Sequence, residues 1–169
     1  MFGDHQDYVN LPIIATTINR NIEVRAKNNN SRYLKIFKKD LGEYDQINID
    51  SDIDKNETDL LKIALRVLKD YSCFPAKGYD LIISSNIPIN SGLSSSSALI
   101  VAWVNFLLTT FTNKEVTSEV LAEISYRIEV TEMGCSGGKM DQYTISYGQT
   151  ISLDTLKDKV ITYNHELCD

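Results

Sequence analysis

The sequence predicts an α+β sandwich, in which early strands are followed by helices packed against one sheet. Strand-like runs fill much of residues 11–49, and helical apolar periodicity first appears after residue 56. The chain contains no internal repeat. With 169 residues, 43% of them hydrophobic, it can bury a substantial core and is expected to form one domain over residues 1–169.

The first strands are expected before residue 50. Residues 11–25 read as one long strand or two short ones, with Asn19–Asn21 as a candidate turn. The run Asn28–Ser31 predicts a turn that precedes a strand over Tyr33–Phe37. Tyr44–Ile49 alternates weakly and could pair with that strand.

Three helices are expected after these strands. They cover Asn56 to about Tyr71, the Ala/Leu-rich residues 98–108, and residues 120–131. The apolar face of the first helix consists of Leu60, Leu61, Ala64, Leu65 and Leu68. The stripe of the third helix consists of Leu121, Ile124, Ile128 and, less strictly, Ser125. Glycines between Gly134 and Gly138 should end the third helix.

The remaining strands complete the expected sheet. One precedes the second helix at Tyr79–Asn86, where Leu81, Ile82 and Ile83 are consecutive. Two more are expected at Tyr143–Ser152 and Lys159–Tyr163, joined by the polar turn Asp154–Asp158.

Charge and composition exclude several classes of protein. The net charge is −6 and the pI is about 4.9, with Lys38-Lys39 the only adjacent basic pair, so a nucleic-acid-binding surface is not expected. The acidity does not exclude a nucleotide ligand, because Mg²⁺ and backbone N–H groups can balance phosphate charge. The longest apolar run falls short of the roughly 20 residues that span a bilayer.

The cysteines and histidines exclude some metal and thiol chemistry. Cys73, Cys135 and Cys168 are odd in number, far apart and without metal-ligand spacing, which suits free thiols and a cytoplasmic location. A catalytic thiol at Cys135 would lack an evident histidine partner. With His5 and His165 as the only histidines, a His-rich metal site is excluded.

The most informative segment is residues 88–98, Pro-Ile-Asn-Ser-Gly-Leu-Ser-Ser-Ser-Ser-Ala. It lies between an expected strand and an expected helix, where the first helical N–H groups lack internal partners and the helix dipole is positive. A phosphate is the expected ligand. The candidate binding residues are Ser91, Gly92, Leu93, Ser94, Ser95, Ser96 and Ser97.

A structural role for the same serines is the alternative. Ser94 or Ser95 could cap the helix, and Gly92 could serve a tight turn. A single serine would suffice for capping, however, and four in a row reduce helix propensity. The segment has neither the lysine of a GxxxxGK[ST] loop nor GxGxxG spacing.

Three motifs together resemble the GHMP kinases. Pro88-x-x-x-Gly92-Leu93-Ser94-Ser95-Ser96-Ser97-Ala98 resembles their phosphate-binding signature. Residues 3–8, Gly-Asp-His-Gln-Asp-Tyr, resemble the sugar signature Gly-Glu-His-Thr-Asp-Tyr of the galactokinase-like members. Residues 137–142, Gly-Gly-Lys-Met-Asp-Gln, resemble the segment Cys-Gly-Ile-Met-Asp-Gln, which carries their catalytic aspartate. The three occur in the family's order across about 140 residues, which makes the signal specific.

The resemblance implies a fold, a reaction and co-substrates. The fold would be the sandwich of ribosomal protein S5 domain 2, with a mixed sheet and helices on one face. The activity would be ATP- and Mg²⁺-dependent transfer of a phosphoryl group to a sugar hydroxyl, giving a sugar 1-phosphate. The resemblance covers only the amino-terminal, ATP-binding domain of such a kinase, without its first strand and its carboxyl-terminal domain.

Asp141 is the candidate catalytic residue. A carboxylate in a loop beside a bound phosphate can accept a hydroxyl proton or orient the attacking oxygen. Taken alone, an acid after a glycine-rich bend and at the entry to a strand is more often a solvated or turn-capping residue. The match to Met-Asp-Gln reverses that preference.

Glu129 and Ser96 are the candidate magnesium ligands. Glu129 and Glu132 are three residues apart near the end of a helix, where acids oppose the dipole, and this hints at a cation. The resemblance implies that Glu129 and Ser96 bind Mg²⁺, which needs few protein oxygens when phosphates are present. Glu132 is expected to be a surface charge.

The amino-terminal motif supplies the candidate sugar-binding residues. Asp4, His5 and Asp7 offer acceptors and a donor for hydroxyl groups, and the resemblance adds Gly138 and Asp141 to this set. The family pattern has Glu at the position of Asp4 and Thr at that of Gln6. These differences leave the identity of the sugar open.

Two functions remain open from sequence. One is an ATP-dependent sugar kinase, which the presence of Asp141 and Glu129 favours. The other is a nucleotide- or sugar-binding module without turnover, such as a half-kinase or a sensor. The second is favoured by the lack of a counterpart to the family's carboxyl-terminal domain and to the basic residue ahead of its sugar motif. Neither the oligomeric state nor a partner chain can be deduced.

Overall fold

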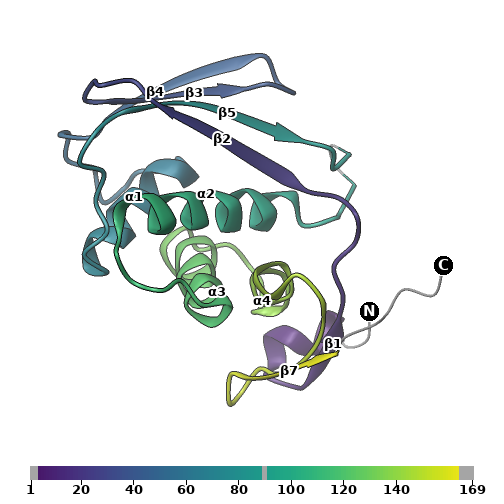
Figure 1. The fold of residues 1–169 in the computed structure, drawn as a ribbon. Coiled ribbons are helices and arrows are strands. Elements are labelled where there is room, and N and C mark those ends of the chain that lie inside the picture. Colours follow the sequence, from purple (N-terminus) through teal and green to yellow (C-terminus); the bar gives the residue numbers. More distant parts are fainter. Residues whose placement is uncertain (1–3, 89–90, 164–169) are drawn as a thin grey trace.

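A four-stranded mixed sheet forms one outer layer of the protein in the computed structural model, which describes residues 4–88 and 91–163 (Figure 1). In hydrogen-bonding order its strands are β2 (Ile22–Asn28), β5 (Tyr79–Ser85), β3 (Tyr33–Lys38) and β4 (Glu43–Asn48). β5 runs antiparallel to β2 and parallel to β3, and β3 pairs with β4 as an antiparallel hairpin. The turn predicted over residues 28–31 therefore joins two strands that β5 separates.

A smaller antiparallel sheet forms the opposite end of the molecule. Its order is β1 (Ile13–Ala15), β6 (Thr150–Asp154) and β7 (Lys159–Tyr163). The stretch 11–25 is thus two strands that belong to different sheets. The α+β class and the mixed sheet are confirmed, whereas the expectation that all strands share one sheet is wrong.

Helices fill the space between the two sheets (Figure 1). Beneath the large sheet lie α1 (Leu60–Asp70) and α2 (Ser95–Phe111). The next layer holds α3 (Ser118–Tyr126), which continues as the π-helix η2 (Arg127–Glu132), together with α4 (Met140–Tyr147). A 3₁₀ helix, η1 (Asp4–Val9), precedes β1. No described helix has both the length and the apolarity required to traverse a bilayer.

Two apolar cores hold these layers together. The larger core joins the four-stranded sheet to α1, α2, α3 and η2, and Trp103 at its centre is fully buried and donates from its indole N–H to the Leu61 carbonyl oxygen (3.1 Å). The smaller core joins the three-stranded sheet to α3 and α4 through Ala122, Met140 and Tyr143. α4 is therefore fixed against the small sheet by its buried face.

The strand expected over Tyr143–Ser152 is wrong at its start, because residues 140–147 form α4. Aromatic and β-branched residues give this stretch a strand-like composition. Tyr143 and Met140 nevertheless share one helical face in the smaller core, and Gly148, at φ +68°, ends the helix in a left-handed conformation. Asp141 accordingly lies in the first turn of a helix and not at the entry to a strand.

Candidate active site

The serine-rich segment ends in a helix N-terminus. α2 begins at Ser95, three residues earlier than expected, so three of the serines form its first turn. The first helical hydrogen bond runs from the Ala98 N–H to the Ser94 carbonyl oxygen (3.0 Å). The N–H groups of Ser95–Ser97 therefore have no acceptor inside the described helix. Such a turn can bind an anion.

Capping does not explain these serines. Ser94 occupies the N-cap position, but its backbone is left-handed (φ 52°, ψ 42°) and its side chain makes no cap hydrogen bond to the described helix. Gly92 is also left-handed, with φ +68°. Ser91, Ser95 and Ser96 are exposed, whereas Ser97 is only 3% exposed, so its side chain points into the protein.

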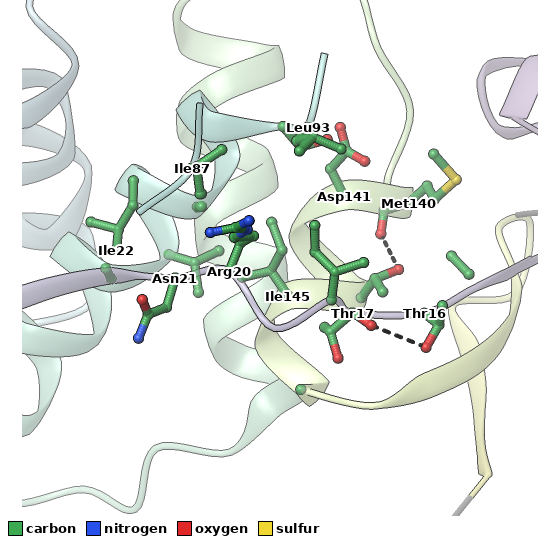
Figure 2. A pocket seen from close by; sticks show the side chains of 18 of the residues that line it. Thr16, Thr17, Arg20, Asn21, Ile22, Ile87, Leu93, Met140, Asp141 and Ile145 are labelled. Atoms are coloured by element: carbon green, nitrogen blue, oxygen red, sulfur yellow. Dashed lines mark hydrogen bonds between the residues drawn. The ribbon is translucent and has the colours of Figure 1, made fainter. Parts of the chain in front are cut away.

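The larger cavity brings this loop and Asp141 together. It has a volume of about 460 Å³ and is lined on one side by Gly92, Leu93 and Ser94 and on another by Asp141 and Thr144 of α4. Figure 2 shows Asp141 projecting from α4 toward Leu93. The loop that leads into α2 and the carboxylate of Asp141 therefore border one space.

Arg20 also lines this cavity (Figure 2), although the sequence did not identify it as a candidate site residue. It lies between β1 and β2, is exposed, and its guanidinium donates to the Asn86 carbonyl oxygen (3.4 Å). No motif distinguishes an arginine in a polar turn from an ordinary surface residue. Only the tertiary fold brings its charge to the cavity that Asp141 also lines.

A smaller cavity of about 310 Å³ adjoins the same helix terminus. Its walls include the side chains of Ile22, Ile83 and Leu99, and Ser95 and Ser96 lie at its edge with Lys38 and Asp40. It is thus mainly apolar, with polar groups beside the first turn of α2. A flat, partly polar ring system is the kind of ligand that such a space accepts.

Glu129 lies on the π-helical segment η2. π-helical turns are rare and often occur at functional sites. Glu129 is 7% exposed, and its Oε2 accepts a hydrogen bond from Gln142 Nε2 across 2.8 Å. Gln142 is 3% exposed, and its Oε1 has no hydrogen-bond partner among the described residues. The pair ties η2 to α4, directly next to Asp141.

Glu132 points to a different set of partners. Its carboxylate pairs with Arg66 (3.1 Å) and Arg127 (3.5 Å) and is partly exposed. The wider turn of a π-helix takes residues three apart off a common face. Glu132 therefore fastens η2 to α1 and takes no part in the polar pair at Glu129.

The side-chain oxygens of Glu129, Gln142 and Ser96 are of the kind that binds a magnesium ion. Among residues 4–88 and 91–163, no three His, Cys, Asp or Glu side chains gather into a group that could hold a metal unaided. Glu129 and Gln142 do present more buried oxygen acceptors than donors, which a divalent cation or its water would satisfy. Ser96 adds an exposed hydroxyl in the first turn of α2.

Asp7 lies inside the protein rather than on a solvated loop. It is 6% exposed, and its two carboxylate oxygens accept hydrogen bonds from the backbone N–H groups of Lys139 and Met140. Gly138 lies directly against this carboxylate. Two members of the predicted sugar set are thus in contact, whereas the side chains of Asp4 and His5 lie outside the described part of the structure.

The fold and the cavity define a class of protein: an α+β domain in which a serine-rich helix N-terminus faces a carboxylate carried on a second helix. The model of the GHMP kinases N-terminal domain matches residues 59–149. This span contains the serine-rich segment, Glu129 and Asp141, and it covers more than half of the chain. The chain belongs to the GHMP kinase family.

Similar proteins agree with this assignment. The chain is 27% identical to the galactokinase of Pasteurella multocida over 157 residues, which cover 88% of this chain and 40% of that protein. The structure of Lactococcus lactis galactokinase complexed with galactose matches 99% of this chain and 45% of its own, with 25% identity and a TM-score of 0.83. Methanococcus jannaschii mevalonate kinase shares the fold, with 22% identity and a TM-score of 0.80. The chain spans about two fifths of the length of the curated galactokinases it matches.

Proposed function

We propose that this chain is the ATP-binding domain of a sugar kinase, which transfers the terminal phosphoryl group of ATP to a hydroxyl of a hexose, with galactose as the first candidate. The observation that carries the proposal is the shared cavity of Gly92–Ser94 and Asp141. Phosphoryl transfer needs little more than a phosphate cradle, charge neutralisation and an oriented hydroxyl. Similarity to galactokinases supports the choice of acceptor.

The nucleotide would bind along the N-terminus of α2. Its phosphates would accept hydrogen bonds from the N–H groups of Ser95–Ser97 and from the segment Ser91–Ser94. Its base would enter the smaller cavity, whose apolar walls suit an aromatic ring and whose edge is formed by Ser95 and Ser96.

Magnesium would be held by Ser96 and Glu129 together with the phosphates. Bound there, the ion would neutralise the charge that develops on the transferred group. Gln142 donates to Glu129 (2.8 Å) and so fixes the carboxylate in place. The role of the protein at this point is to supply two oxygen ligands and to keep them in position.

Asp141 would orient the acceptor hydroxyl and accept its proton. Its position in the first turn of α4 puts the carboxylate on the cavity side of the helix, facing the loop that would hold the phosphates. Asp4, His5, Asp7 and Gly138 would form the sugar side of the site. The two aspartates of this set disfavour acceptors that carry a carboxylate, such as mevalonate.

A panel of acceptors offered to the full-length protein tests the proposal. ADP release would be measured with galactose, other hexoses, mevalonate and homoserine. We expect a free hexose, galactose first, to give the highest kcat/KM. Preference for mevalonate, homoserine or a phosphorylated acid over every free sugar would refute the choice of substrate. Release of ADP with none of these acceptors would refute the proposed kinase activity.

The alternative function is a nucleotide- or sugar-binding module without turnover. It is the weaker candidate because Gly92–Ser94 and Asp141 line one cavity, and Glu129 is bonded to Gln142, the residue that follows Asp141. We also propose a cytoplasmic location, which the free thiols of Cys73 and Cys135 support.

A further inference from the structure

The N-terminus of α4 is capped by a side chain from a distant part of the chain. Asp7 lies in η1, 132 residues before Lys139, and its Oδ1 accepts a hydrogen bond from the Lys139 N–H (2.9 Å). Its Oδ2 accepts one from the Met140 N–H (2.9 Å). Lys139, the N-cap residue of α4, makes no side-chain cap bond within the described helix. Asp7 therefore supplies the cap that the local sequence lacks, with a negative charge at the positive end of the dipole.

The close approach of Asp7 requires a glycine at position 138. A Cβ atom added to Gly138 would overlap the Asp7 carboxylate, so no larger residue fits while that carboxylate is in place. A Cβ atom added to the neighbouring Gly137 would meet no described atom within 4 Å. Neither glycine has a positive φ, so the requirement at Gly138 is steric. The pair offers a test position and a matched control, side by side.

We propose that Asp7 is a positioning residue for Asp141, in addition to its place near the sugar. By bonding to two consecutive N–H groups, it fixes the first turn of α4, in which Asp141 follows directly after Met140. η1 and α4 are thereby joined into one structural unit. This inference rests on the proposed function, in which Asp141 acts on the acceptor hydroxyl.

Small displacements of a catalytic group have large effects on rate. Effective proximity requires the reacting atoms to lie within about 3–3.5 Å, and a misplacement of about 1 Å can reduce the rate on the order of a hundredfold. Loss of the cap would loosen the turn that carries Asp141 without touching the nucleotide site. We therefore expect the loss to appear in kcat, with the Kd for ATP unchanged.

The experiment uses Asp7→Ala, Gly138→Ala, the double variant and the control Gly137→Ala. Amide hydrogen exchange at Lys139 and Met140 is measured without ligands, and kcat, the KM for the sugar and the Kd for ATP are measured in the full-length protein. Asp7→Asn is added because it preserves side-chain shape. Its one amide oxygen can accept a hydrogen bond from only one of the two N–H groups with the original geometry.

Both single variants should accelerate exchange at Lys139 and Met140 by about tenfold and lower kcat by about 10- to 100-fold. The double variant should be no worse than Asp7→Ala, because the three atoms nearest to the added methyl of Gly138→Ala all belong to the Asp7 carboxylate. Asp7→Asn should retain partial protection, and Gly137→Ala should resemble the parent in both measurements.

Unchanged exchange in Asp7→Ala would overturn the capping role. Additive effects in the double variant, or a rise in sugar KM with kcat unchanged, would overturn the positioning role and leave Asp7 as a sugar ligand alone. The exchange measurement needs no turnover. A parent protein that turns over no acceptor would therefore refute the proposed function, and the positioning of a catalytic Asp141 with it, while the exchange rates still decide the cap.

Discussion

Gln142 donates a hydrogen bond from its Nε2 to Oε2 of Glu129 across 2.8 Å, and both side chains are buried. The bond joins the π-helix η2 to α4. Consecutive residues of α4 are therefore the proposed catalytic base, Asp141, and the partner of the proposed metal ligand, Gln142.

Replacing Gln142 by Met should destabilise the fold. The substitution keeps the side-chain length but removes the donor, which leaves a buried carboxylate without its partner. We expect a loss of about 1–3 kcal/mol in the free energy of unfolding, measured by urea titration. Gln46→Met, at an exposed position of β4, should change it by less than about 0.5 kcal/mol. Equal effects of the two substitutions would contradict a structural role for the Gln142–Glu129 bond.

Ser96→Ala should weaken binding of the magnesium complex of ATP while leaving stability intact. Ser96 is exposed in the first turn of α2, so its hydroxyl contributes little packing. Loss of one ligand should lower affinity on the order of tenfold, equivalent to about 1.4 kcal/mol. The affinity would be measured by titration with a fluorescent ATP analogue, and the same titration in EDTA is the internal control. An unchanged affinity in Mg²⁺ would remove Ser96 from the metal site.

Cys73 should make stability fall at alkaline pH. Burial raises the pKa of its thiol from 9.0 to about 11, and its Sγ lies 3.4 Å from the Leu107 carbonyl oxygen. The folded state therefore retains a proton that the unfolded chain releases, and the resulting stabilisation is complete below about pH 9 and is lost as the pH rises toward 11.

The measurement compares urea unfolding of the parent and of Cys73→Ala at several pH values. The stability advantage of the parent should shrink between pH 9 and 11. Cys135→Ala, at an exposed position, should follow the parent throughout. A constant difference between the parent and Cys73→Ala would show that the thiol does not titrate as expected.

The elements that sequence patterns identified are those stabilised by local signals. α1 was predictable because its apolar face is regular, and the side chain of Asp59 caps it by accepting from the N–H groups of Leu61 and Lys62. β3 and β4 were predictable as a hairpin because they are close in sequence and pair directly.

The elements that were missed depend on contacts between distant residues. α4 resembles a strand in composition, and its cap comes from Asp7, 132 residues earlier. The three-residue strand β1 exists only through its pairing with β6. In the candidate site, Asp141 and Glu129 were predicted from the resemblance to the family. Arg20 and the Gln142–Glu129 bond were not, because only the tertiary fold brings them to the site.

Asp141→Asn in the full-length protein tests the central claim most directly. The substitution preserves shape and removes the proton acceptor, so phosphorylation of galactose, followed by ADP release, should fall by about 10²–10⁴-fold while the Kd for ATP stays the same. Asp52→Asn, at an exposed position, is the control and should retain full activity. Turnover of Asp141→Asn within about tenfold of the parent would contradict the assignment of Asp141 as the group that orients and deprotonates the acceptor.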